Sequence, residues 1–187
     1  MSIWHRSTIA LLAGLLTACM IVRAPSKEEL FALNHPPETI SQKVNILAPK
    51  VLAWFDELEL TWAMQTRALN DKELERARLV GVRQPERIRV AISDTLPLPT
   101  DPELLWAAKN YGLGAKSEGG RTHGYLIILK PDSLKYPEIM QHEFVHVSQY
   151  ESLGRQAFVQ RYLIELEMLG YARSPLELQA YAKQNLK

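Results

Sequence analysis

The stretch from Glu38 to Ala68 repeats apolar side chains at spacings of mostly three and four residues. Such spacing places them on one side of an α-helix, and that side must be buried against another surface. The apolar positions are Ile40, Val44, Leu47, Val51, Trp54, Phe55, Leu58 and Trp62. A hydrophobic fraction of 47% in 187 residues supplies the core of one domain. Pro49 lies inside the pattern and predicts a kink or a break.

Turn residues and periodicity predict the other elements. Asn70-Asp71-Lys72-Glu73 is typical of a cap that opens a short helix, which ends near Gly81. Polar and apolar residues alternate in 87–93 and predict a strand, and the apolar run 124–129 predicts another. The glycines between 112 and 120 predict turns. Further helices are expected near 102–110, 136–152, 156–169 and 175–185. Helices, a small sheet and then helices indicate an α+β fold.

The N-terminal residues predict export. Residues 7–18 are almost wholly apolar, and this run is too short for a bilayer span but suits the core of a signal peptide. The run ends in Leu16-Thr17-Ala18-Cys19, which resembles the bacterial lipoprotein signal, where the chain is cut before the cysteine and the thiol is acylated. Cys19 is the chain's single cysteine. An uncleaved anchor extended by Met20-Ile21-Val22 is the alternative.

The chain is therefore expected to have three parts. A signal peptide occupies 1–18, a tether with a lipidated Cys19 occupies 19–37, and one domain occupies 38–187. This organisation predicts a lipid-anchored protein of the cell envelope that faces the periplasm or the exterior. The net charge is +1 and no basic block is present, so no nucleic-acid partner is expected.

The motif His142-Glu143-Phe144-Val145-His146 lies in the helix expected at 136–152. Histidines four residues apart project from the same side of a helix and can share one tetrahedral ion. Glu143, next to the first histidine, can reach a water that the metal activates and act as its general base. The pattern predicts a Zn²⁺ site with His142 and His146 as ligands and Glu143 as a catalytic residue.

The third ligand is expected to be a carboxylate. No histidine follows His146, and the single cysteine excludes a cysteine-based site. Glu165, Glu167 and Glu177 remain candidates, whereas Glu151 lies on the motif helix and is rotated away from the ligands. Glu165 and Glu167 also fit the solvated side of an amphipathic helix. Ser174-Pro175-Leu176-Glu177 fits a capping box, in which the glutamate would bond to the backbone instead.

The strand at 124–129 followed by the motif helix resembles the zincin metallopeptidases, in which an edge strand pairs with an extended substrate. Residues 65–185 resemble a group of small bacterial His-Glu-x-x-His proteins, similar to the metallopeptidase-like domain of extracellular contractile injection systems and toxins. Pro175–Ala180 resembles the Glu-x-x-Ala segment of membrane-associated gluzincins. These resemblances imply a zincin-like fold and Glu177 as the third ligand; Tyr181 stands where that family has an aspartate.

Two functional hypotheses follow. The first is a membrane-anchored zinc peptidase that acts on a peptide or protein, and the second is a non-catalytic envelope lipoprotein that uses the same scaffold for binding. Several other polar residues are weaker candidates. Gln149 is placed to bond to a ligand histidine. His123 is expected in a turn or on the surface, and the tyrosines are expected in the core, although each type offers an oxyanion donor. These tyrosines are Tyr150, Tyr162 and Tyr171.

Overall fold

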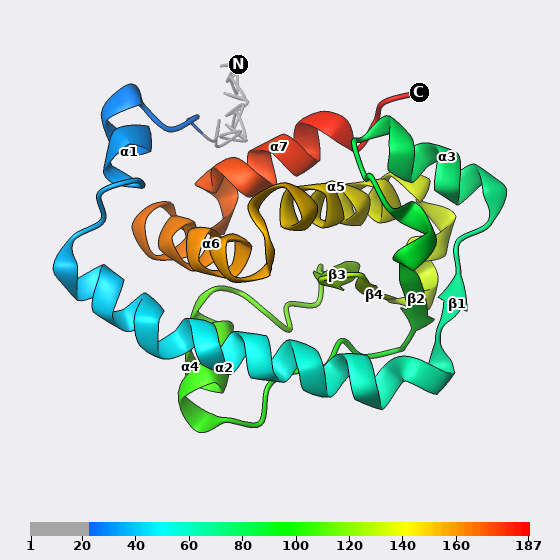
Figure 1. Ribbon diagram of the computed structural model, residues 1–187, viewed down its shortest axis with the longest axis horizontal. Coiled ribbons are helices and arrows are strands. Elements are labelled where there is room, and N and C mark those ends of the chain that lie inside the picture. The colour runs from blue at the N-terminus through cyan, green and yellow to red at the C-terminus, as the bar shows by residue number, and fades with distance from the viewer. Residues whose placement is uncertain (1–22) are drawn as a thin grey trace, which may run out of the picture.

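The computed structural model describes residues 23–187, so the expected signal peptide and lipidated Cys19 lie outside the described residues. The fold is α+β (Figure 1). The helices are α1 (Lys27–Ala32), α2 (Glu38–Trp62), α3 (Asp71–Leu79), α4 (Pro102–Asn110), α5 (Pro137–Leu153), α6 (Arg155–Leu169) and α7 (Pro175–Lys183). The strands are β1 (Arg67–Ala68), β2 (Arg89–Ile92), β3 (Gly120–His123) and β4 (Leu126–Leu129). Within residues 23–187, no helix is long and apolar enough to cross a membrane.

The four strands form one mixed sheet in the order β1-β2-β4-β3. β2 and β4 are parallel, and the other two pairs are antiparallel. This order corrects the expectation that the strand before the motif helix lies at the edge. All four residues of β4 are buried, as in a strand covered on both faces, and β4 is internal. The edge strand next to β4 is β3, in a segment where the sequence predicts turns, and β1 forms the opposite edge.

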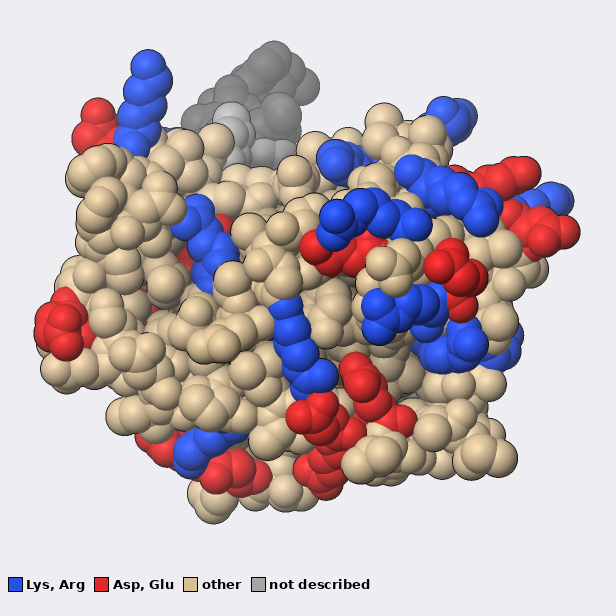
Figure 2. Space-filling model, viewed as in Figure 1, with Lys and Arg blue, Asp and Glu red and all other residues tan. Residues whose placement is uncertain are grey.

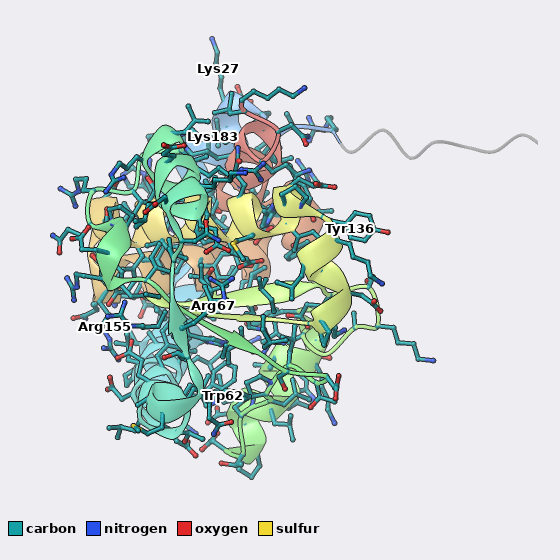
Figure 3. All side chains as sticks on the ribbon, turned by 90° about the vertical axis from the view of Figure 1, so that its right-hand side faces the viewer. Lys27, Trp62, Arg67, Tyr136, Arg155 and Lys183 are labelled. Atoms are coloured by element: carbon teal, nitrogen blue, oxygen red, sulfur yellow. The ribbon has the colours of Figure 1, made fainter. Side chains whose placement is uncertain are left out.

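Helices cover both faces of the sheet, as Figures 1 and 3 show from two directions. Successive side chains of a strand point to opposite faces, so the buried residues of β2 and β4 divide into two clusters. Val90, Ile127 and Leu129 pack with residues of α3 and α5. Ala91, Leu126 and Ile128 pack with residues of α2, α4 and α6.

The N-terminal part of the described chain differs from the expectation in two ways. α2 continues through Pro49, so of the predicted kink or break, the break is wrong. Residues 27–32, expected in a tether, form α1, because Ser26 and Glu29 make a capping box there. Glu29 also pairs with Arg173 at 2.7 Å, which ties α1 to the segment before α7.

Charges of both signs are intermixed on the face in Figure 2, chiefly at the end where α3 lies. Asn70 and Glu73 form the predicted capping box at the start of this helix. Glu73 also pairs with Arg67 of β1 at 2.7 Å. Opposite charges thus connect α3 with the neighbouring strand.

Candidate metal centre

α5 carries the two motif histidines into the interior. Pro137 occupies its first turn, where the missing N–H costs nothing, and Gly154 ends it with a positive φ of 83°. Most of its central residues are buried, including His142 and His146, which are each 7% exposed. Their rings lie 4.9 Å apart, centroid to centroid. The helix therefore aims two imidazoles at one buried point, as their spacing predicts.

Glu177, in the first turn of α7, meets these histidines. Nε2 of His142 lies 3.1 Å from Nε2 of His146 and 3.3 Å from Oε2 of Glu177. Nε2 of His146 lies 3.4 Å from Oε1 of Glu177. Ligands at 2.0–2.1 Å from a tetrahedral metal are separated from one another by about 3.3–3.4 Å. The spacing of these atoms therefore suits one ion held by all three side chains.

Hydrogen bonds on the far side of each imidazole indicate which nitrogen carries the proton. Gln149 donates to the Leu176 carbonyl at 2.9 Å, which turns its own Oε1 toward Nδ1 of His146, also at 2.9 Å. Oε1 of Gln184 lies 3.3 Å from Nδ1 of His142. Each Nδ1 thus donates to an amide oxygen, so that in the neutral form of each ring Nε2 presents a lone pair to the centre. The hydrogen bond expected between Gln149 and a motif histidine is confirmed.

With both rings neutral, as metal ligands must be, the two histidines offer only acceptors to the centre. Two imidazole lone pairs and a carboxylate converge, and Oε2 of Glu177 is buried with no hydrogen-bond partner among the described residues. Acceptors crowded at such distances repel one another unless a cation lies between them. The donor set of two histidines and one glutamate fits Zn²⁺.

Ser174 and Glu177 do not form the capping box that competes with the ligand role. The Ser174 hydroxyl accepts from the Glu177 amide at 3.3 Å, so the serine does cap α7. The Glu177 carboxylate points the other way, and Tyr162 donates to its Oε1 at 2.6 Å. Burial raises the pKa of Glu177, but interactions with the two histidines in their protonated form and the hydrogen bond from Tyr162 outweigh burial and hold the pKa well below its ordinary value. The carboxylate is ionised, as a ligand must be.

The other two candidate glutamates do not reach the histidines. Glu165 is 1% exposed and accepts from the Ser174 hydroxyl at 2.6 Å and the Leu176 amide at 2.9 Å. The expectation that it is solvated is wrong, because it anchors the first turn of α7 from inside the protein. Glu167 accepts from Lys43 at 2.5 Å and from Tyr111.

Glu143 lies beside the triad and next to the free edge of the sheet. The Thr122 hydroxyl of β3 donates to its Oε2 at 2.7 Å. A Cβ on Gly120 would lie 3.4 Å from Oε1 of Glu143 and 2.4 Å from a Leu129 methyl, so any larger residue there would require the buried Leu129 side chain to shift. Among the described residues, none donates a hydrogen bond to Oε1 of Glu143. One carboxylate oxygen is held, and the other is free to accept a proton.

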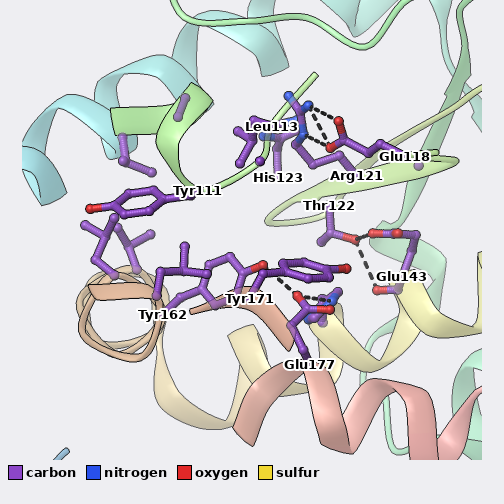
Figure 4. A pocket seen from close by; sticks show the side chains of 18 of the residues that line it. Tyr111, Leu113, Glu118, Arg121, Thr122, His123, Glu143, Tyr162, Tyr171 and Glu177 are labelled. Carbon is purple, nitrogen blue, oxygen red and sulfur yellow. Dashed lines mark hydrogen bonds and ion pairs between the residues drawn. The ribbon is translucent and has the colours of Figure 1, made fainter. Parts of the chain in front are cut away.

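A cavity of about 510 Å³ joins Glu143 and the triad to an apolar interior. In Figure 4, Tyr162, Tyr171 and Glu177 lie on one side and Leu113 and His123 on the other. The Tyr171 and Tyr181 hydroxyls lie 3.3 Å apart at the rim, where both residues are partly exposed. The Tyr181 ring packs against the His142 ring at 4.7 Å. The cavity is of the size that small-molecule sites have.

The weaker candidates divide between the cavity and the core. Tyr171 and Tyr162 line the cavity, whereas Tyr150 packs between Tyr125 and Phe158. His123 lines the cavity and is fully buried, which corrects its expected place in a turn or on the surface.

Sequence reasoning missed Thr122, Gln184 and the anchoring role of Glu165. Only the position of Gln184 could have been predicted from the sequence, because it follows Glu177 by two helical turns and so lies on the same side of the helix. Thr122 and Glu165 acquire their roles only from contacts with residues distant in the sequence.

Zinc binding by this centre is expected to tighten as the pH rises. Burial lowers the pKa of His146, but the hydrogen bond and charge of Glu177, followed by Glu143 and Gln149, raise the pKa to about 9. At pH 7 a proton therefore occupies the metal-free site and must leave when zinc binds. The apparent affinity should rise about tenfold per pH unit toward pH 9. Competition with a chelator of known pH dependence measures this, and a flat profile contradicts it.

Substitution Glu165→Gln is expected to lower the free energy of unfolding by about 2–3 kcal/mol, because buried charge-assisted hydrogen bonds to Ser174 and Leu176 are weakened. Zinc affinity should fall about tenfold or more, since the start of α7 positions Glu177. Denaturant titration of the EDTA-treated protein and zinc competition measure the two effects. Glu75→Gln, at an exposed position on α3, is the matched control and should change neither quantity. Equal unfolding free energies and equal zinc affinities of the two variants would show that Glu165 does not anchor α7.

Comparison of the chain with family models, curated proteins and solved structures finds no match.

Proposed function

We propose that the protein is a zinc-dependent peptidase of the zincin type, with His142, His146 and Glu177 as ligands and Glu143 as general base. The observation that carries the proposal is the convergence of three buried acceptor groups beside a carboxylate with one free oxygen. A closed structural zinc site has four protein ligands, whereas three leave a position open for water and substrate. The described residues offer three.

The chemistry divides between the ion and the protein. Zinc, when bound, supplies a Lewis acid that makes water nucleophilic near neutral pH. Glu143 takes the proton of the attacking water on its free oxygen and delivers it to the amide nitrogen that leaves. Thr122 holds the other oxygen, so that the base keeps one orientation. The Tyr171 hydroxyl at the rim donates to the carbonyl oxygen as negative charge develops there.

The free edge of β3 supports a peptide substrate. β3 pairs with β4 on one side only, and its residues Gly120 to His123 line the cavity beside Glu143. An extended peptide can bond to such an edge as an added strand. This arrangement also supports the resemblance to zincins. The edge strand that would pair with the substrate is β3, and not the strand expected at 124–129.

The lipid anchor expected at Cys19 remains part of the proposal. It would hold the domain at a membrane surface of the cell envelope, facing the periplasm or the exterior. The substrates would then be peptides or proteins of that compartment.

Metal analysis and a chelator test examine the proposal together. The purified protein should contain one zinc per chain and cleave members of a peptide library, and phenanthroline should abolish cleavage until zinc is restored. The His142→Ala variant should contain no zinc and cleave nothing. Absence of zinc from the wild type at neutral pH would overturn the proposal. Zinc without cleavage of any peptide would favour the non-catalytic envelope lipoprotein instead.

A further inference from the structure

His123 is a buried polar side chain without a partner. It is 0% exposed, and neither ring nitrogen has a hydrogen-bond partner among the described residues. The rings of Trp54 and Phe55 each contact it in a T-shaped arrangement with centroids 5.0 Å away. Burial, helped by the charge of Arg121, lowers its pKa well below the ordinary value, so the ring is neutral. A neutral imidazole offers one donor and one acceptor, and leaving both unused in the interior is costly.

The side chain of His123 faces away from the metal centre, although it lines the same cavity. β3 pairs Thr122 with Ile127, on the sheet face toward α5, and His123 with Leu126, on the face toward α2. The cavity includes both Thr122 and His123, so it extends around the free edge of β3 from one face of the sheet to the other.

The far part of the cavity is apolar. Its walls come from α2, α4 and α6 and include Val51, Leu104, Ala108, Val159, Leu163 and Leu166. The charged residues on this side, Arg121 and Glu118, pair with each other at 2.7 Å. A carboxylate or ammonium group placed among these walls would lose its hydration without gaining a partner.

We propose that this far part is a specificity pocket for an uncharged, mainly apolar group of the substrate, and that His123 hydrogen-bonds to a hydroxyl or carbonyl oxygen on that group. The inference rests on the proposed function, since the amide to be cleaved would lie at the triad. Ligand sites commonly combine apolar walls with a few polar groups that fix orientation. His123 is then a specificity-determining residue that takes no part in the reaction itself.

Calorimetric titration of the EDTA-treated protein with straight-chain primary amides, from acetamide to decanamide, tests the pocket. Affinity should rise roughly fourfold per added methylene until the pocket is full. Ala108→Leu narrows the apolar wall and should end this rise at a shorter chain. Ala157→Leu, at an exposed position on α6, is the matched control and should bind as the wild type does. Affinity independent of chain length in the wild type would overturn the proposal.

The same amides with a terminal hydroxyl test His123. At the chain length that brings the hydroxyl to the imidazole, the wild type should bind the hydroxylated amide about tenfold more tightly than His123→Phe does. His123→Phe should still bind unsubstituted amides at least as well as the wild type, which also shows that it folds. His123→Gln, which keeps a donor and an acceptor, should recover part of the preference. An unchanged preference in His123→Phe would overturn the role of His123.

These titrations use metal-free protein, so they separate the two proposals. Chain-length dependence without zinc binding would sustain the pocket and reject the peptidase. Zinc binding and peptide cleavage without chain-length dependence would sustain the peptidase and reject the pocket.

Discussion

Substitution Glu143→Gln is expected to slow peptide hydrolysis by about a hundredfold to ten-thousandfold, the range that general base catalysis contributes. A glutamine has nearly the same shape and can still accept the hydroxyl hydrogen of Thr122 through its amide oxygen. It cannot take a proton from water. The proposed zinc ligands are untouched, so one zinc per chain should remain.

Single-turnover cleavage of the best peptide from a library, together with zinc content, measures this effect. Glu138→Gln on the same helix removes the same charge away from the cavity and is the matched control. Thr122→Val removes the hydrogen bond that orients the Glu143 carboxylate, and it should reduce the rate of hydrolysis about tenfold at unchanged zinc content. Full activity of the Glu143→Gln protein would reject Glu143 as the base.

Substitution Glu177→Gln is expected to weaken zinc binding by more than about a hundredfold, beyond the loss usual for residues that only support a ligand. It removes the single negative charge among the three proposed ligands, while the two histidines stay in place on α5. Tyr162 can still donate to the side-chain oxygen of the glutamine, and the backbone N–H of residue 177 can still donate to the Ser174 hydroxyl, so the fold should survive.

Zinc competition measures this loss, and Glu167→Gln supplies the control that decides between the candidate ligands. Glu167 is an alternative third ligand in the sequence, but its carboxylate bonds to Lys43 and Tyr111. Its substitution should leave zinc affinity unchanged. Equal affinity of the Glu177→Gln and wild-type proteins would show that the carboxylate is not a ligand.

The parts of the centre that the sequence predicts are local. Two histidines four residues apart in a helix must share a side, and the glutamate between them follows from the same geometry. The third proposed ligand depends on distant contacts. In the sequence, Glu165 and Glu167 fit the solvated side of an amphipathic helix, and Glu177 fits a capping box. Glu167 is not available as a ligand because its carboxylate bonds to Lys43, which lies 124 residues away in the sequence.

The fold shows the same division. The helices from α2 to α7 follow largely from apolar periodicity and caps, although tertiary packing keeps α2 continuous through Pro49. β3 was missed because Gly119 just before it and Gly120 at its start are typical of a turn, and its extended form depends on pairing with β4. α1 carried a readable signal in Ser26 and Glu29, which the expectation of a tether passed over.

The position of α7 gives the proposed metal binding a second consequence. This helix of nine residues carries Glu177 in its first turn and is capped by Gln184. Short elements of a protein can open locally, with free energies smaller than that of global unfolding. The proposed ion would bridge α5 and α7 and bind only while α7 is closed on α5, so it would stabilise that closed state in proportion to the logarithm of its concentration. Backbone amides of α7 would therefore exchange with solvent at a rate set by available zinc, which would make α7 a reporter of metal supply.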